Sequence, residues 1–332
     1  MYPASSRDRF NRSPISAGSV GKRKKRRFLL DDLQLVMLSL PSIVWYVMFC
    51  YVPLFGIVIA FKNYKLAPGK GFIYSLFVRS KWVGLKNFAF LFKSPDVLII
   101  FRNTIGYNLI FLLIGLVLPV TLAILISHMH SRRLAKTFQT AMFLPHFLSW
   151  VVISYFVYAF LSTDRGLFNQ LLRSMGKDPV TWYQQVKYWP FFLVFLNTWK
   201  TMGYSMVVYL ASLSGIDHSL YESAVIDGAT KWQQVKGITI PLLRPVISIL
   251  FIMNVGHIFN TDFGLFYQAT RDSNSLASVT ETIDVYVYKA LMERSNYAFA
   301  SASGLLQSVL GCIMIISTNY LVKKIDPDSG FF

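Results

Sequence analysis

Charged residues are scarce in this 332-residue sequence, making up 15% of it, against about 25% in soluble domains. Acids are the scarcest, with 16 Asp and Glu beside 33 Lys and Arg. Hydrophobic residues reach 54% and gather in runs of about 18 or more, the length needed to cross a bilayer core. This pattern excludes a soluble enzyme and makes the lipid bilayer the solvent for most of the chain.

Two further absences narrow the chemistry. The chain has only two cysteines, Cys50 and Cys312, both inside apolar runs and without a C-x-x-C pair, so no cysteine-based metal or redox site is expected. The phosphate-binding motif G-x-x-x-x-G-K-[ST] is also missing, because none of the three Gly-Lys pairs is followed by Ser or Thr. We therefore predict no cofactor, no metal and no ATP site in this chain.

The net charge of +17 does not indicate nucleic acid, because the cations stand in short segments between the apolar runs. Anionic lipid explains them more simply. Six consecutive cations, 22–27, precede the first apolar run and are expected to hold the N-terminus in the cytoplasm. We predict a membrane partner and no nucleic acid.

Six apolar runs predict an all-α, polytopic membrane protein. The predicted spans are 33–61, 99–127, 140–161, 188–213, 242–263 and 297–322. The first run is about twice as long as the apolar region of a cleavable signal peptide, so we expect it to remain as a helix. An even number of spans places both termini on the cytoplasmic side.

This topology divides the chain into four parts: a basic cytoplasmic tail (1–32), the first span with its external loop (33–98), a core of five spans (99–322) and a short cytoplasmic tail (323–332). The external loop 62–98 carries seven cations and one acid, Asp96, which opposes the usual excess of cations on the cytoplasmic side. We assign the orientation from the cations of the N-terminal tail, because the charges beside the first helix usually determine the topology of the whole chain.

The longest cytoplasmic connection between spans is 214–241. Its first part, 218–226, is compatible with a helix, with Ser219 as N-cap and Glu222 at capping-box spacing. Gly228 can adopt the positive φ that ends a helix, and Pro241 suits the start of the next one. The segment predicts a short helix, a glycine turn and a second helix, standing off the membrane.

This connection resembles the EAA loop of binding-protein-dependent ABC importer permeases. The resemblance rests on Glu222-Ser223-Ala224-Val225-Ile226-Asp227-Gly228-Ala229, followed at the family's spacing by Ile238-Thr239-Ile240-Pro241. Ser223 and Ile240 depart conservatively from the family pattern. Further segments are similar to the sugar and polysaccharide branches of the family: Gly84-Leu85-Lys86-Asn87-Phe88, Arg102-Asn103-Thr104 and residues 143–150.

The resemblance implies a type I ABC importer permease in the inner (plasma) membrane. It also implies three partners: an ATPase dimer that binds ATP and magnesium, a second homologous permease forming a heterodimer, and an external solute-binding protein. In that family the loop is a coupling helix that contacts the ATPase. Carried over, the coupling residues are Glu222, Ser223, Ala224, Asp227, Gly228, Ala229 and Pro241. The alternative is a solvated amphipathic loop that only caps the preceding span.

Polar side chains inside spans are costly and usually face a cavity. In the fourth span Asn197, Lys200 and Tyr204 share one face with Thr201. In the fifth, Asn254 and His257 share a face with Thr261, and Asn260 lies near the outer end. We predict that these residues line a path for sugar hydroxyls. Helix packing is the alternative for the asparagines, and an ion pair or a carbonyl contact for Lys200.

The basic external loop favours an acidic oligosaccharide or polysaccharide such as alginate, drawn in by electrostatic steering. Docking of an acidic binding protein or contact with lipid headgroups explains the same charge. A membrane enzyme is not expected, because acids are nearly absent from the spans. An ion-coupled carrier acting without an ATPase remains as an alternative, but it needs membrane acids and internal symmetry, and the sequence has neither.

Overall fold

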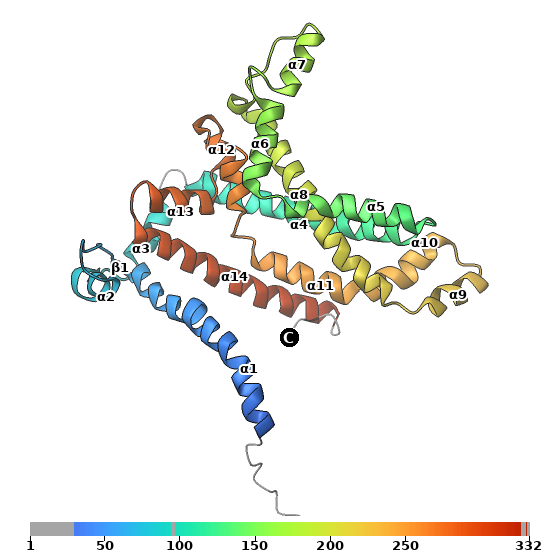
Figure 1. Cartoon of the computed structure of the whole chain (residues 1–332), viewed down its shortest axis with the longest axis horizontal. Coiled ribbons are helices and arrows are strands. Elements are labelled where there is room, and N and C mark those ends of the chain that lie inside the picture. Colours follow the sequence, from blue (N-terminus) through green and yellow to red (C-terminus); the bar gives the residue numbers. More distant parts are fainter. Residues whose placement is uncertain (1–29, 94–96, 327–329, 331–332) are drawn as a thin grey trace, which may run out of the picture. The chain divides into compact units, whose positions relative to one another are not determined.

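The computed structural model describes residues 30–93, 97–326 and 330 (Figure 1). The cation cluster 22–27 lies outside these residues, as do 327–329 and 331–332 of the predicted C-terminal tail. The described chain is helical apart from one pair of two-residue strands, which confirms the all-α prediction. The described residues up to Phe55 belong to one compact unit, and those from Gly56 onward belong to another.

The first unit is a long apolar helix. α1 (Leu30–Tyr46) continues into a π-helical turn (Val47–Tyr51) and a 3-10 segment (Val52–Phe61) that passes into the second unit. Every side chain from Leu35 to Phe55 is exposed. A helix that is apolar on all sides and buries none of them is suited to hydrocarbon or to a partner subunit. The helix predicted over 33–61 is therefore present.

The predicted external loop begins with a small folded hairpin. β1 (Lys62–Asn63) pairs antiparallel with β2 (Lys81–Trp82), and between them lie α2 (Phe72–Tyr74) and a π-helical turn (Ser75–Arg79). α3 (Lys86–Lys93) follows. The side chain of Asn87 donates to the carbonyls of Ala60 and Lys62, at 2.8 and 3.0 Å, and so ties α3 to the first strand.

Two long helices form the centre of the second unit. α4 (Val97–Ser127) packs along α8 (Trp189–Ser214), with Ala123, Met206 and Tyr209 buried between them. α5 (Arg132–Phe143) lies against α8 where Gly203 leaves room: a Cβ on Gly203 would stand 2.0 Å from the carbonyl oxygen of Met142. Shorter helices connect the long ones: α7 (Leu167–Ser174), α12 (Ala277–Thr280) and α13 (Ile283–Met292).

α11 (Ile240–Gly256) packs along α14 (Tyr297–Ile325), and two glycines set how closely they approach. A Cβ on Gly256 would lie 2.4 Å from the side chain of Ile315, and one on Gly311 would lie 2.5 Å from the carbonyl oxygen of Gly256. The two helices therefore meet backbone to backbone.

The prediction of one continuous helix over the third span, 140–161, is wrong. α5 gives way to a 3-10 turn (Leu144–Phe147) before α6 (Trp150–Leu161), and the two helices are bent by 100°. Pro145 lacks an N–H and restricts the residue before it, and Ser149 caps α6 by accepting from the N–H of Val152. These local signals end one helix and start another.

The fifth predicted span, 242–263, ends early, at Gly256. The backbone beyond it bonds to other elements. The side chain of Asn108 donates to the carbonyls of Ile258 and Asn260, and the Asp284 carboxylate accepts from the N–H of Thr261. These partners take the place of helical hydrogen bonds, so the chain leaves the helix after Gly256.

Among the described residues, four helices are long and apolar enough to cross a bilayer, and a fifth if α5 and α6 form one broken span. α8 has 26 residues and is long enough to cross a bilayer, but the polar residues on one of its faces make it less apolar than those helices. Together with α8, these helices account for the predicted total of about six spans.

Candidate functional site

The predicted coupling segment folds as a short exposed helix with a defined end. α9 (His218–Ile226) is capped at its start by Asp217, whose side chain accepts from the N–H of Ser219. That backbone hydrogen bond holds the pKa of the Asp217 carboxyl below its usual value of 3.8. The prediction of Ser219 as the N-cap is wrong by two residues, because Asp217 already provides the side-chain acceptor.

Gly228 ends α9 with a φ of +78°, as predicted. Its N–H donates to the carbonyl of Val225, and the next N–H, of Ala229, donates to the carbonyl of Ala224. This pair of bonds is the Schellman arrangement that closes a helix on a left-handed residue. Ala224 and Ala229, both half-buried, meet inside this turn.

A second cap follows at once. The hydroxyl of Thr230 accepts from the N–H of Gln233, and the side chain of Gln233 accepts in return from the N–H of Thr230, which forms a capping box. The buried side chain of Gln234 donates to the carbonyl of Ala229 at 3.1 Å. The turn and the start of the next helix therefore form one rigid elbow.

The second helix runs directly into the fifth span. α10 (Lys231–Gln234), a π-helical turn (Val235–Thr239) and α11 make a continuous helix from Lys231 to Gly256. Pro241 stands in the first turn of α11, as predicted, and the π-helical turn joins this start to α10 without a break. Tyr221 reaches back from α9 and its hydroxyl lies 3.0 Å from that of Thr239.

The outer end of α9 offers a surface to a partner. Glu222, Asp227 and Gly228 are exposed, and Ile226 is 85% exposed. The hydroxyl of Ser223 donates to the carbonyl of Ser219, so it is occupied within the helix. The exposed face combines two carboxylates with an apolar tip, which suits insertion into a partner more than contact with water alone.

The predicted polar face of α8 is present, but its cation is occupied. The ammonium of Lys200 donates to the carbonyls of His146 and Leu148, at 3.0 and 2.6 Å, in the break between α5 and α6. Of the roles considered for Lys200, namely substrate contact, ion pair and carbonyl contact, the structure shows the carbonyl contact. Asn197 is half-buried beside it, while Tyr204 is 51% exposed and stacks on the ring of His146, with 4.8 Å between centroids.

The predicted polar face of the fifth span is only partly helical. Asn254 is exposed within α11, and no hydrogen bond to its side chain forms within the described residues. His257 caps the end of α11, with its Nδ1 atom 2.9 Å from the carbonyl of Met253. Asn260 lies beyond the helix with its carbonyl held by Asn108. Thr261 also lies beyond the helix, so the predicted face of Asn254, His257 and Thr261 is not one continuous helical face.

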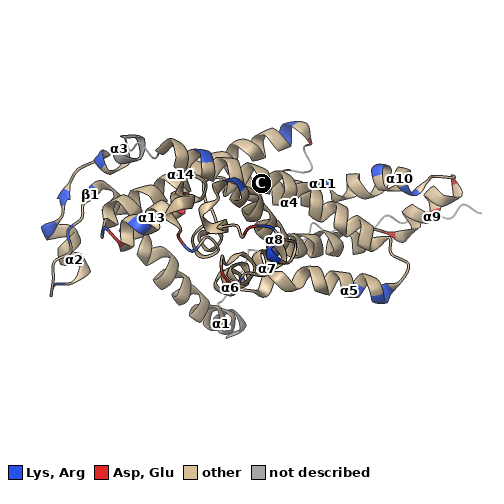
Figure 2. Cartoon of the chain, turned by 90° about the horizontal axis from the view of Figure 1, so that it is seen from above, with Lys and Arg blue, Asp and Glu red and all other residues tan. Residues whose placement is uncertain are grey.

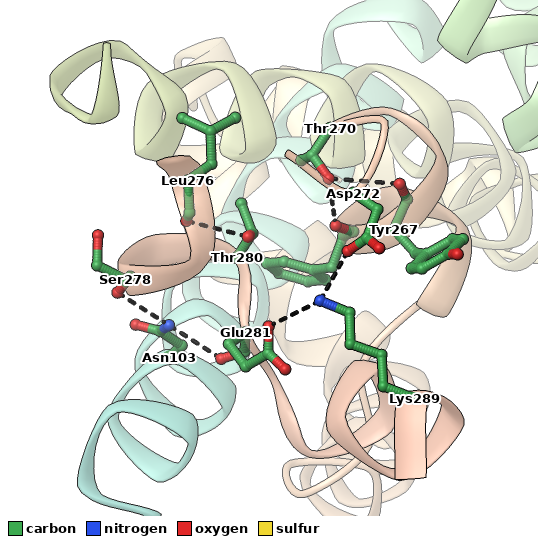
Figure 3. Close-up of polar contacts among 10 residues, drawn as sticks. Asn103, Tyr267, Thr270, Asp272, Leu276, Ser278, Thr280, Glu281 and Lys289 are labelled. Carbon is green, nitrogen blue, oxygen red and sulfur yellow. Dashed lines mark hydrogen bonds and ion pairs between the residues drawn. The ribbon is translucent and has the colours of Figure 1, made fainter. Parts of the chain in front are cut away.

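A polar clamp in the N-terminal part of α4 was not predicted, although its residues belong to the 102–104 segment. Asn103 donates to the carbonyls of Ser278 and Glu281 (Figure 3). Thr104 accepts from the N–H of Ile283. Arg102 also donates to the carbonyl of Ser278 at 2.6 Å. These bonds fix the segment between α11 and α14 to the N-terminal part of α4.

The same loop contains the ion pairs found among the described residues. Lys289 lies 2.7 Å from Asp272 and 3.2 Å from Glu281 (Figure 3). Burial alone would lower the pKa of Lys289, but the two carboxylates more than offset it, and the net pKa stands above the ordinary 10.5. In the part of the chain that is described, no cluster of three or more His, Cys, Asp or Glu side chains is placed to hold a metal.

Comparisons with known proteins agree with this geometry. Residues 115–327 match the family model "Binding-protein-dependent transport system inner membrane component". The polygalacturonan/rhamnogalacturonan transport system permease protein YteP of Bacillus subtilis (strain 168) is 31% identical over 91% of this chain and 92% of its own.

Two solved structures have the same fold over nearly their whole length. A chain of a bacterial ABC transporter involved in the import of the acidic polysaccharide alginate superposes with a TM-score of 0.78, at 30% identity, over 90% of this chain and 97% of that one. A chain of a bacterial alginate ABC transporter in complex with an alginate pentasaccharide-bound periplasmic protein gives 0.76, at 29% identity, over 90% and 98%.

Proposed function

Because this chain belongs to the family of binding-protein-dependent transport system inner membrane components, we propose that it forms half of a membrane path for acidic oligosaccharides or polysaccharides. The chain is a permease subunit of a sugar ABC importer, in the inner membrane. In our proposal a second, homologous permease forms the other half, and an ATPase dimer drives the movement. Both termini face the cytoplasm, on the side of α9.

The observation that carries the coupling role is the double-capped elbow at the end of α9. The Schellman turn at Gly228 and the capping box at Thr230 hold α9 at a fixed angle to the long helix 231–256. A partner that moves the exposed tip of α9 therefore moves the span as well. We assign the ATPase contact to Glu222, Ser223, Asp227 and Ile226, and the shape of the elbow to Ala224, Gly228 and Ala229.

We assign the substrate path to exposed polar side chains on α8, on α11 and just beyond α11. Tyr204 offers a half-exposed ring in a stack with His146, and aromatic rings are suited to the apolar faces of sugars. Asn254, His257 and Asn260 are exposed around the outer end of α11. Asn197 packs beside this path. Lys200 supports the path indirectly, because its hydrogen bonds stabilise the break between α5 and α6.

An acidic substrate is supported by the external hairpin. Lys65, Arg79, Lys81 and Lys86 are exposed there, and Figure 2 shows cations around β1 and α2. Lys62 is not part of this surface, because its buried ammonium donates to the carbonyl of Leu76. Since one of the similar structures imports alginate, an acidic polysaccharide, we propose a substrate of that class, delivered by an external solute-binding protein.

The test is a gentle detergent pull-down of the tagged full-length chain from its native membrane, with every co-purifying protein identified. We expect an ATPase and a second permease. Gly228→Asp should lose the ATPase, because Gly228 has a positive φ at the proposed contact. Gly176→Asp is the matched control: Gly176 also has a positive φ, +71°, and open space at its Cβ, but it lies in the predicted external loop 162–187.

Uptake in proteoliposomes of the recovered complex then tests the substrate. We expect ATP-dependent uptake of alginate oligosaccharides in preference to neutral ones of equal length. Recovery of the chain without any ATPase under all nucleotide conditions would overturn the importer assignment. Equal uptake of neutral and acidic oligosaccharides would leave the importer intact and overturn the proposed substrate class.

A further inference from the structure

A groove of about 680 Å³ lies between α4 and the long helix 231–256. This volume is within the range of about 300–1,000 Å³ found for small-molecule sites. The walls are apolar over most of their length, and the residues that line them are Leu116, Val117, Val120, Ile124, Leu125, Val235, Ile240 and Ile247. Thr121 also lines the groove, but its hydroxyl donates to the carbonyl of Val117 at 2.8 Å. This donor is therefore satisfied within α4 and needs no polar ligand.

The polar lining residues gather at one end of the groove. His128 follows the last residue of α4, and Lys231 is the first residue of α10, so this end is where both helices leave the membrane. Trp232 is 71% exposed beside them, at a level where tryptophan is favoured between headgroups and hydrocarbon.

Lys231 has a free charge at this end. Its ammonium lies 3.3 Å from the side-chain oxygen of Gln234, a neutral partner. Within the described residues it forms no ion pair with a carboxylate. A cation that is not neutralised by its own chain, at the mouth of an apolar groove, is complementary to an anion with a long apolar tail.

The length of the groove distinguishes a lipid from a protein helix. Residues 116–128 of α4 span about 18 Å at about 1.5 Å per residue. One leaflet of a hydrocarbon core about 30 Å thick is about 15 Å. An acyl chain from one leaflet ends near the bilayer centre, whereas a span of a second permease crosses the full thickness. The groove has the depth of one leaflet.

We propose that this groove binds an anionic phospholipid of the cytoplasmic leaflet, with one acyl chain along the apolar walls and the phosphate beside Lys231. Only the side of the membrane rests on the proposed function, since the coupling helix defines it. Basic pockets between membrane helices on this side bind anionic headgroups. Because Lys231 follows directly after the cap at Thr230, the phosphate would also steady the elbow that holds α9.

The experiment is native mass spectrometry of the importer complex, purified in mild detergent with equal amounts of phosphatidylglycerol and phosphatidylcholine. We expect retained phosphatidylglycerol to fall about fivefold in Lys231→Gln, the effect of one cation beside an anionic headgroup. Lys236→Gln is the matched control, since Lys236 is exposed nearby but does not line the groove. Val117→Trp, which fills the groove, should reduce retention of both lipids.

Three outcomes would overturn this proposal. Equal losses in Lys231→Gln and Lys236→Gln, or full retention in Val117→Trp, would mean diffuse attraction without a site. Lipid bound by the isolated chain but absent from the complex would assign the groove to a helix of the second permease. The readout is the mass of bound lipid, so a complex that keeps its lipid but fails to transport would count against the proposed function alone.

Discussion

The Nζ atom of Lys200 donates a hydrogen bond of 2.6 Å to the carbonyl oxygen of Leu148, across the break between α5 and α6. A second bond, of 3.0 Å, goes to His146. The ring of Trp150 lies 5.5 Å from the same ammonium. The cation of one helix thus satisfies the carbonyls that a second helix exposes where it bends.

We expect Lys200→Met to lower the thermal stability of the purified complex, because it leaves two carbonyls without their donor, at a cost of about 1–3 kcal/mol each. Thr201→Val is the control on the same helix, since the Thr201 hydroxyl bonds only within α8. Unfolding followed by intrinsic fluorescence measures both. Unchanged stability in Lys200→Met together with lost uptake would make Lys200 a substrate contact instead.

A pair of alanine substitutions tests the contact between α11 and α14. Gly311→Ala should destabilise the protein by about 1–3 kcal/mol, because its Cβ would collide with the backbone of Gly256. Gly304→Ala, seven residues earlier in the same helix, meets nothing within 4 Å and should be neutral or stabilise by up to about 1 kcal/mol. Equal effects on the midpoint of thermal unfolding would contradict the close approach.

The positions of most helices were predictable from the sequence, because runs of apolar residues are long and unambiguous. The ends of 99–127, 188–213 and 297–322 agree with α4, α8 and α14 to within three residues. The sharp bend at Pro145 was not predicted, since a proline in an apolar run is also tolerated inside a span, as Pro119 is in α4. The early end of α11 depends on Asn108 and Asp284, which are distant in the sequence.

In the coupling segment, the turn at Gly228 was predictable from the sequence, but the side-chain hydrogen bonds around it were not. Gly228 was recognisable because few residues other than glycine adopt a positive φ. The bonds from Gln234 to Ala229 and from Tyr221 to Thr239 depend on how two helices fold back on each other, which no local pattern specifies. The Asn103 clamp was visible as a motif, but its partners lie 175 and 178 residues further along the chain.

The ion pairs of Lys289 are expected to order the segment between α11 and α14. Lys289→Met should destabilise residues 264–296 by about 1–2 kcal/mol, less than for fully buried pairs because Asp272 is one-third exposed. Hydrogen exchange of this loop measures the change. Arg294→Met is the control for loss of a nearby charge, and an equal gain in exchange there would contradict a specific role for Lys289.

The pH dependence of this loop follows from the raised pKa of Lys289. A group whose pKa is higher in the folded protein contributes its full stability below its ordinary pKa of 10.5 and loses it as the pH rises through the folded value. Protection of the loop attributable to Lys289 should therefore be constant from about pH 6 to about pH 9 and fall only in stronger alkali. A fall near neutrality would point to a different group.

The capping box at Thr230 gives the last prediction. Thr230→Ala removes the side-chain acceptor for the N–H of Gln233 and should cost about 1 kcal/mol of local stability, seen as faster exchange over residues 229–236. Thr230→Ser keeps the hydroxyl and should behave like the native chain. If the elbow transmits motion, Thr230→Ala should also lower uptake per ATP hydrolysed, whereas an unchanged ratio would separate the cap from coupling.

The π-helical turn at Val235–Thr239 has a geometric consequence for the whole span. A π-helical turn holds one residue more than an α-helical turn, and each residue rotates the following side chains by about 100°. The turn therefore sets the angular phase between the elbow at one end and Asn254 at the other. Deleting one residue there would leave both ends intact in sequence while aiming the span at a different neighbour.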